Sequence, residues 1–228
     1  MEIRPHADQQ YEAELQALRN EILRMGALVE EQIAGAIKAL VERDGDAARA
    51  IIEHDHSVNR MDVEIDEMCL CLIALHQPTA RDLRLITTAL KITTDLERAG
   101  DMAEHISERV LELNTEPLLK PLIDIPRMAE IALAMLRDSL DAFVREDPDL
   151  ALQVCKRDDQ MDALMDQLFR ELVSFMIEDP KCITRAIRLT FVAKYLERMA
   201  DACTNICEMV VYMAEGRIIR HGGIHPTR

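Results

Sequence analysis

Hydrophobic residues recur every three or four positions through most of this chain, a spacing that places them on one face of an α-helix. One stripe lies between positions 51 and 75, and another lies between positions 85 and 113. Each stripe lasts three to four heptads, so long helices packed side by side are predicted. The first stripe consists of Ile51, His54, Val58, Met61, Ile65, Met68, Leu72 and Leu75.

The second half of the chain repeats the first. The segment DLERAGD at 95–101 matches YLERMAD at 195–201, an offset of 100 residues that holds without a gap between positions 62 and 110. Further upstream, 41–46 matches 144–149, an offset of 103. A repeat of this length indicates a duplicated domain and not a short solenoid unit.

Breaks in the helical pattern set the domain boundaries. The first helix of each copy is expected at about 9–43 and 124–146. Asp147-Pro148 and Asp179-Pro180 are typical helix starts, because each places a capping residue before a proline at the first helical position. Thr79 begins an approximate capping box. We therefore predict an all-α fold of two tandem, pseudo-symmetric three-helix bundles with six long helices. The expected ranges are 9–116 for the first bundle, 122–216 for the second and 217–228 for a short tail.

Composition agrees with helices and narrows the possible partners. Only 7 Gly and 8 Pro occur among 228 residues, and 49% of the residues are hydrophobic. The net charge of −15 argues against nucleic acid and against direct binding to an anionic membrane. No apolar run approaches the length of a spanning helix, and the amino-terminal residues do not resemble a secretory signal. The six cysteines lie within helical segments, which favours reduced, mostly buried thiols in a cytoplasmic protein.

Pairs of carboxylates flank the hydrophobic stripes at a spacing of four residues, so each pair projects from one helix face. If neighbouring helices bring two pairs together, each copy offers four carboxylates. An all-oxygen set suits hard cations such as Mg²⁺ or Mn²⁺, or carboxylate-bridged iron. The candidate metal ligands are Asp62, Asp66, Glu97, Asp101, Asp162, Asp166, Glu197 and Asp201.

A solvated helix face is the competing interpretation of these pairs. The chain has 42 acidic residues, so several pairs at this spacing are expected by chance, and duplication alone would preserve their register. Spacing by itself leaves both interpretations open. No nucleophile–base arrangement and no glycine-rich phosphate loop occur, so we expect no enzyme. A metal-dependent hydrolase or oxidase that uses the same carboxylates is the alternative.

Three segments resemble the PhoU family, the accessory proteins of bacterial phosphate transport and signalling. The segment HQPTARDLRL at 76–85 is similar to the family's entry into its third helix. LERAGD at 96–101 matches its Leu-Glu-Arg-Ile-Gly-Asp pattern, and NICE at 205–208 resembles its ending. The likeness covers nearly the whole chain, in order and in both copies.

The resemblance implies two PhoU-like bundles that associate into a homodimer, with iron, Mg, Zn or Mn at the eight candidate carboxylates. It also implies a cytoplasmic, non-enzymatic regulator that represses the phosphate-starvation response. Its partners would be a histidine kinase and the ATPase subunit of the high-affinity phosphate transporter, so it would reach the inner membrane only through them. Ala200 departs from the family pattern, which has Gly at this position, so helix approach in the second copy is expected to differ.

Overall fold

The structure, a computed structural model, describes residues 5–54 and 56–219, in which every regular element is helical. The predicted all-α fold is confirmed. Residues 220–228 of the predicted tail lie outside the described residues. The elements are α1 (Pro5–Glu42), α2 (Gly45–His54), α3 (His56–His76), α4 (Ala80–Leu113), α5 (Asp124–Arg145), α6 (Pro148–Cys155), α7 (Asp158–Glu178), the 3-10 turn η1 (Pro180–Cys182) and α8 (Ile183–Glu215).

The six predicted helices appear as six long spans, and the second span of each repeat is divided into two helices. Repeat one comprises α1–α4, and repeat two comprises α5–α8. In repeat two the division falls at Lys156 and Arg157, and Arg157 pairs with Asp138 of α5 at 2.5 Å. Asp158 and Asp159 follow in the first turn of α7, where carboxylates favourably face the positive end of the helix dipole.

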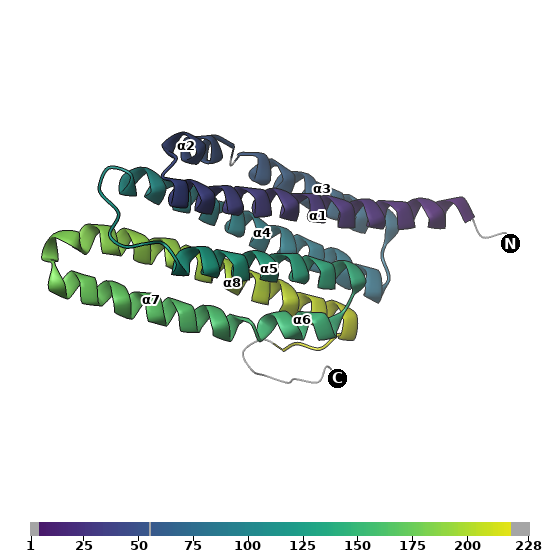
Figure 1. Cartoon of the computed structure of the whole chain (residues 1–228). Coiled ribbons are helices and arrows are strands. Elements are labelled where there is room, and N and C mark those ends of the chain that lie inside the picture. Colours follow the sequence, from purple (N-terminus) through teal and green to yellow (C-terminus); the bar gives the residue numbers. More distant parts are fainter. Residues whose placement is uncertain (1–4, 55, 220–228) are drawn as a thin grey trace.

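Helices α4 and α8 form the centre of the molecule and run antiparallel. Arg84 at the start of α4 donates from Nε to the carbonyl oxygen of Met213 at the end of α8, at 3.2 Å. At the other end, Nε of Arg188 lies 2.9 Å from a carboxylate oxygen of Glu112. Figure 1 shows α1 and α5 side by side, with α2 and α3 at one edge of the bundle and α6 and α7 at the opposite edge.

Helices α1 and α5 approach closely because α1 carries a glycine at their contact. A Cβ built on Gly26 would lie 2.1 Å from Cδ1 of Leu140, so any side chain there would displace the leucine. Arg19 of α1 pairs with Glu146, just after α5, at 2.8 Å. Arg81 of α4 binds the same carboxylate at 2.8 Å, which ties both repeats together at this end.

The first helix of each repeat ends in the same way. Arg43 (φ 58°) and Glu146 (φ 52°) adopt the left-handed conformation. The following residues, Asp44 and Asp147, donate their backbone N–H groups to carbonyl oxygens five residues earlier, each at 2.9 Å. This is the Schellman pattern of helix termination, and its recurrence supports the duplication read from the sequence.

The predicted helix starts are partly confirmed. Asp147 accepts hydrogen bonds from two backbone N–H groups at the start of α6, and Asp179 accepts one at the start of η1. The capping box at Thr79 was wrong, because the Thr79 hydroxyl donates to the Asp82 carboxylate and caps no backbone group.

Buried side chains of both repeats form one continuous hydrophobic core within the described residues. The division into bundles at 9–116 and 122–216 therefore stays a prediction. Two members of the predicted stripe, His54 and Leu75, are exposed, and they lie at or near the ends of α2 and α3. Four of the six cysteines are buried, in line with the expectation of mostly buried thiols, while Cys155 is half-buried and Cys71 is exposed.

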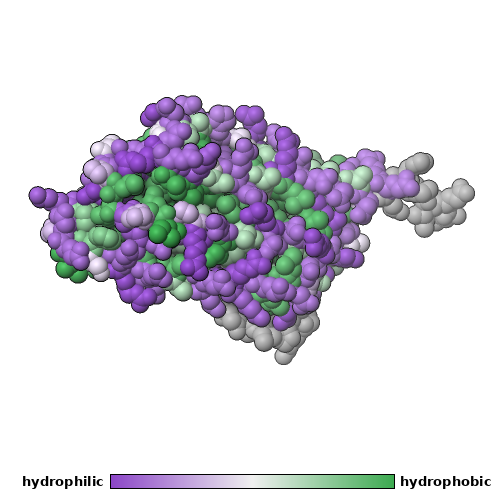
Figure 2. Space-filling view, in the orientation of Figure 1, coloured by the Kyte–Doolittle hydropathy of each residue, from purple (hydrophilic) through white to green (hydrophobic). Residues whose placement is uncertain are grey.

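Hydrophobic surface remains on the face shown in Figure 2. It lies partly over the segment between the repeats and the start of α5, where Leu118 and Ile123 are exposed. Within residues 5–54 and 56–219, no helix combines the length and the apolar character that crossing a membrane requires.

Candidate functional site

Acidic side chains from two helices gather on the outer side of repeat two. Asp162 lies on α7 directly after the buried Met161, and Glu197 lies on α8 directly after the buried Leu196. Asp201 follows Glu197 by one helical turn, so both project from the same side of α8. The antiparallel packing of α7 against α8 brings the two acidic faces together.

Electrostatic coupling shows that these carboxylates are close to one another. Partial burial and then the charge of Glu197 raise the pKa of Asp201, and Asp162 on the neighbouring helix adds to the increase. The cations Lys194 and Arg198 oppose it. Lys194 also forms an ion pair with Glu197. The cluster is therefore acidic overall but partly neutralised from within α8.

Asp158, which is absent from the predicted ligand set, belongs to this cluster. Burial raises its pKa to about 6, and the charges of Asp201, Asp162, Asp159 and Glu197 contribute in that order. Its Oδ1 atom is buried and has no hydrogen-bond partner. The sequence did contain a signal for this residue, since an acid at a position of the apolar stripe of repeat two stands where repeat one has Val58.

Asp166 is placed differently from the other predicted ligands of repeat two. It projects from α7 one turn beyond Asp162, and like Asp162 and Asp201 it is exposed. Unlike Asp162, it is not among the main charges that shift the pKa of Asp158 or Asp201. The structure thus brings together Asp162, Glu197 and Asp201 of the predicted set and adds Asp158 to them.

In repeat one the acidic pairs lie on α3 and α4. Burial and the charge of Asp66 raise the pKa of Asp62. Glu97 and Asp101 are half-buried on α4. The space that Asp158 occupies in repeat two is filled here by the fully buried Val58.

Gly100 and Ala200 mark a packing difference beside the acidic pairs. A Cβ built on Gly100 would lie 3.2 Å from Cγ1 of Val58, a tight contact. In repeat two Ala200 carries that methyl group and is fully buried, and the residue matched with Val58 is Asp158. Glycine thus accompanies valine, and alanine accompanies aspartate, at the two matched positions.

The acidic residues do not form a closed metal site as they stand. Across the part of the chain that the structure describes, no three His, Cys, Asp or Glu side chains converge closely enough to hold a metal ion. The donor chemistry of repeat two nevertheless fits a hard cation, because its oxygens repel one another and Oδ1 of Asp158 lacks a partner.

Comparison with known proteins identifies the family. The PhoU domain family matches residues 22–110 and 125–210, one domain in each repeat. The chain belongs to the PhoU family. The two matched ranges correspond to the two copies found by aligning the chain with itself.

Relatives of this PhoU-family chain match over nearly their full length. The phosphate-specific transport system accessory protein PhoU of Escherichia coli (strain K12) is 37% identical over 223 residues, which cover 98% of this chain and 92% of that protein. The homologue of this accessory protein from Aquifex aeolicus is 42% identical over 208 residues, covering 91% and 94%.

Solved PhoU structures share the fold. The crystal structure of PhoU from Pseudomonas aeruginosa superposes with a TM-score of 0.87 at 38% identity, covering 90% of this chain and 99% of that one. The phosphate transport system regulatory protein PhoU from Streptococcus pneumoniae gives a TM-score of 0.85 at 32% identity, covering 91% and 98%. The architecture predicted from the resemblance is therefore confirmed.

Proposed function

We propose that this chain is a non-enzymatic regulator of phosphate uptake and of the phosphate-starvation response. It acts as an adaptor between the ATPase subunit of the high-affinity phosphate transporter and a phosphate-sensing histidine kinase, and it represses the response when phosphate is ample. It works in the cytoplasm as a homodimer and reaches the inner membrane through these partners. The observation that carries the proposal is the nearly full-length similarity to phosphate-specific transport system accessory proteins.

The proposal includes divalent or trivalent cations at the acidic pairs. In repeat two Asp158, Asp162, Glu197 and Asp201 would hold the cation, with Asp166 at the edge of the site. In repeat one the corresponding residues are Asp62, Asp66, Glu97 and Asp101. Oxygen donors suit Mn, Mg, iron or Zn, and the charge supplied by the cation would offset the mutual repulsion of the carboxylates. These side chains would orient the cation between two helices and so join them.

A pull-down tests the adaptor role. The tagged chain is incubated at high phosphate with the purified transporter ATPase subunit and, separately, with the detergent-solubilised kinase. Recovery of both partners is expected, because an adaptor must bind each of them. Recovery of neither partner would overturn the proposal.

Metal analysis tests the cation sites independently of the partners. Protein purified without chelator or affinity metal is compared with Asp101→Ala, Asp201→Ala and the control Asp141→Ala, which removes an exposed acid on α5. We expect stoichiometric metal that falls in the first two variants and stays unchanged in the control. The absence of metal after reconstitution with Mn²⁺, Mg²⁺, Fe²⁺ and Zn²⁺ would reduce the acidic pairs to a solvated surface.

A further inference from the structure

Large apolar side chains are exposed at the end of the molecule where α7 and α8 join. We call these five residues the apolar patch, and Figure 1 shows the two helices side by side there. Soluble proteins seldom expose apolar side chains in contiguous groups, and such groups mark interaction surfaces. The patch consists of Phe169 (48% exposed), Ile177 (76%), Ile183 (40%), Ile187 (42%) and Phe191 (46%).

The patch shares an outer face with the acidic cluster. Phe169 follows Asp162 by seven residues, which is two helical turns, and Ile183 precedes Asp201 by eighteen residues, which is five turns. Because the facing acids fix the antiparallel register of α7 and α8, Ile177 lies near the level of Ile183. The apolar and acidic residues therefore follow one another along the same helix pair.

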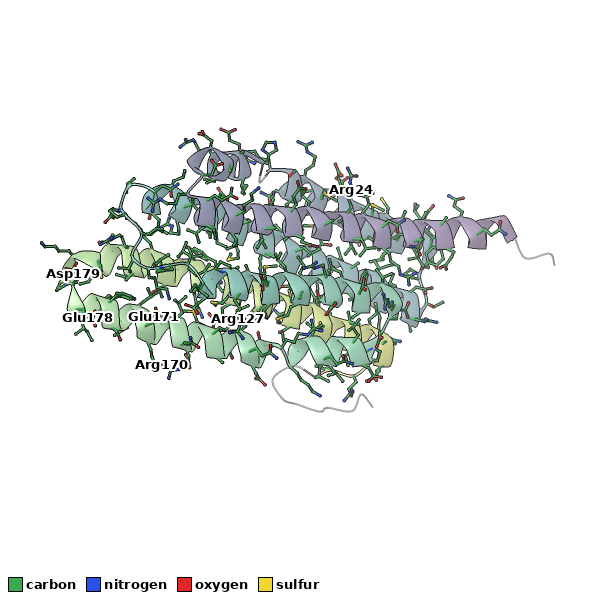
Figure 3. The ribbon with its side chains drawn as sticks, viewed as in Figure 1. Arg24, Arg127, Arg170, Glu171, Glu178 and Asp179 are labelled. Carbon is green, nitrogen blue, oxygen red and sulfur yellow. The ribbon has the colours of Figure 1, made fainter. Side chains whose placement is uncertain are left out.

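The inner side of α7 is occupied by other contacts. Glu171 forms an ion pair with the buried Lys120, which also binds Asp124 of α5 at 2.7 Å. Figure 3 shows Glu171 on the side of α7 that faces α5, and Arg170 projecting from the opposite side. The patch thus lies away from the contact between α7 and α5.

Repeat one has only part of the patch, because Leu83 matches Ile183 and is equally exposed at 40%. At three other matched positions it has Gln77, Thr87 and Lys91, where repeat two has Ile177, Ile187 and Phe191. The shared core of the duplicated fold therefore does not require apolar residues at these positions. Their exposure in repeat two costs solvation without contributing to the core, which points to a surface that is covered in the functional state.

The charge of this outer face indicates what kind of partner covers the patch. The acidic half of the face carries Asp158, Asp162, Asp166, Glu197 and Asp201, against the two basic residues Lys194 and Arg198, so it would stay negative with one divalent cation bound. A second copy of this chain, with a net charge of −15, would be repelled by this half. A partner with Lys or Arg beside its own apolar side chains would complement both halves.

We propose that the outer face of α7 and α8 docks an amphipathic helix of a partner protein. Its apolar residues, spaced by three or four positions, would cover the patch, and a following turn rich in Lys or Arg would lie on the acidic half. Residues 158–177 of α7 span about 30 Å, enough for a partner helix of about 18 residues. The inference rests on the proposed adaptor function and names a surface and a partner chemistry for it.

A synthetic peptide tests the face directly. The probe is a fluorescein-labelled 18-residue helix with Leu at the contact positions of one half and Lys at those of the other, and binding is followed by fluorescence anisotropy. The protein is treated with EDTA so that no cation neutralises the acidic half. We expect saturable binding that weakens with added salt and that disappears when every Lys of the probe is replaced by Glu.

Matched variants of the protein locate the binding. Ile177→Asp and Phe191→Asp change exposed residues, and each should weaken probe binding by about tenfold or more. The control Leu75→Asp changes an equally exposed residue near the end of α3 (75%, against 76% for Ile177) and should leave the affinity within about twofold. Equal binding by all variants, or equal binding of the Glu-containing probe, would overturn the proposal.

Two further measurements separate this inference from its alternatives. The first is sedimentation velocity. If it shows a dimer that Ile177→Asp converts to a monomer, and the probe does not bind, the occupant is a second copy of this chain and the proposal is overturned. Pull-downs in which Ile177→Asp and Phe191→Asp retain both partners would leave the adaptor role intact and reject this face. Probe binding without recovery of either partner would reject the adaptor role alone.

Discussion

The two repeats share their core and differ in their acidic faces. Both end their first helix with a left-handed residue and present acids spaced by four residues on the later helices. Repeat one fills the space between α3 and α4 with Val58, against which Gly100 packs. Repeat two has Asp158 and Ala200 there, so an additional carboxylate joins the cluster. A duplicated helical frame thus keeps most of its buried stripes, while single substitutions within or next to a stripe change the electrostatics.

The largest effect is expected from giving repeat one the acid of repeat two. Val58 is fully buried against Gly100, so Val58→Asp places a carboxylate in an apolar space already occupied by a well-packed side chain. We expect the free energy of unfolding to fall by about 3 kcal/mol or more, measured by urea denaturation. The isosteric Val58→Thr is the milder control. A loss below about 1 kcal/mol in Val58→Asp would show that the two repeats offer equivalent space.

The reverse exchange should alter the pH dependence of stability. The pKa of Asp158 is raised to about 6 in the folded protein, above its value in the unfolded chain. Between about pH 4 and 6 the folded state therefore binds more protons, and this residue makes stability fall as pH rises. In EDTA-treated protein, the free energy of unfolding of Asp158→Val relative to that of the wild type should therefore rise by about 2–3 kcal/mol between pH 4 and pH 7.

The measurement is the free energy of unfolding in urea of the wild type and of Asp158→Val at each pH. In the difference between the two values, the contributions of the other carboxylates largely cancel. Asp159→Val, at the exposed neighbouring position, serves as the control and should show a much smaller pH-dependent difference. A wild-type protein and an Asp158→Val variant with parallel stability profiles would contradict the assignment of Asp158 to the cluster.

Cation affinity should differ between the repeats. Because repeat two contributes Asp158 in addition to the shared acids, Asp158→Asn should weaken Mn²⁺ binding there by about tenfold, while Asp62→Asn should affect only the site of repeat one. Isothermal titration of the metal-free protein would resolve the two changes. Identical effects of Asp158→Asn and of the control Asp159→Asn would exclude Asp158 as a ligand.

The smallest expected effects come from the paired small residues. Ala200→Gly removes a buried methyl group and lowers helix propensity, so a loss of about 1–2 kcal/mol is expected. Gly100→Ala gains propensity but tightens the contact with Val58, so its net change should stay within about 1 kcal/mol. Thermal denaturation of both variants measures the asymmetry. Equal losses would mean that the packing beside the two acidic faces is the same.

Some features of the site could be read from local periodicity, and others could not. The spacing of Glu197 and Asp201 was enough to place both on one side of a helix, because side-chain direction follows from the helical repeat. Asp162 and Asp166 were both predicted as ligands, but only Asp162 is among the main charges that raise the pKa of Asp158 and Asp201. Which turn of α7 lies opposite Asp201 depends on the relative position of the two helices along their axes, and the spacing within one helix does not determine it.

The amino-acid sequence by itself determined the all-α class, the duplication and most of the buried faces, since these depend on contacts within a few turns of one helix. Only the tertiary structure decided that α4 and α8 run antiparallel at the centre, that Leu140 packs directly against Gly26, and that Asp158 lies close to Asp201. These features depend on residues far apart in the chain, and their relative positions are set by how helix surfaces interlock. The energy of a buried carboxylate depends on that long-range packing, which the helical repeat does not encode.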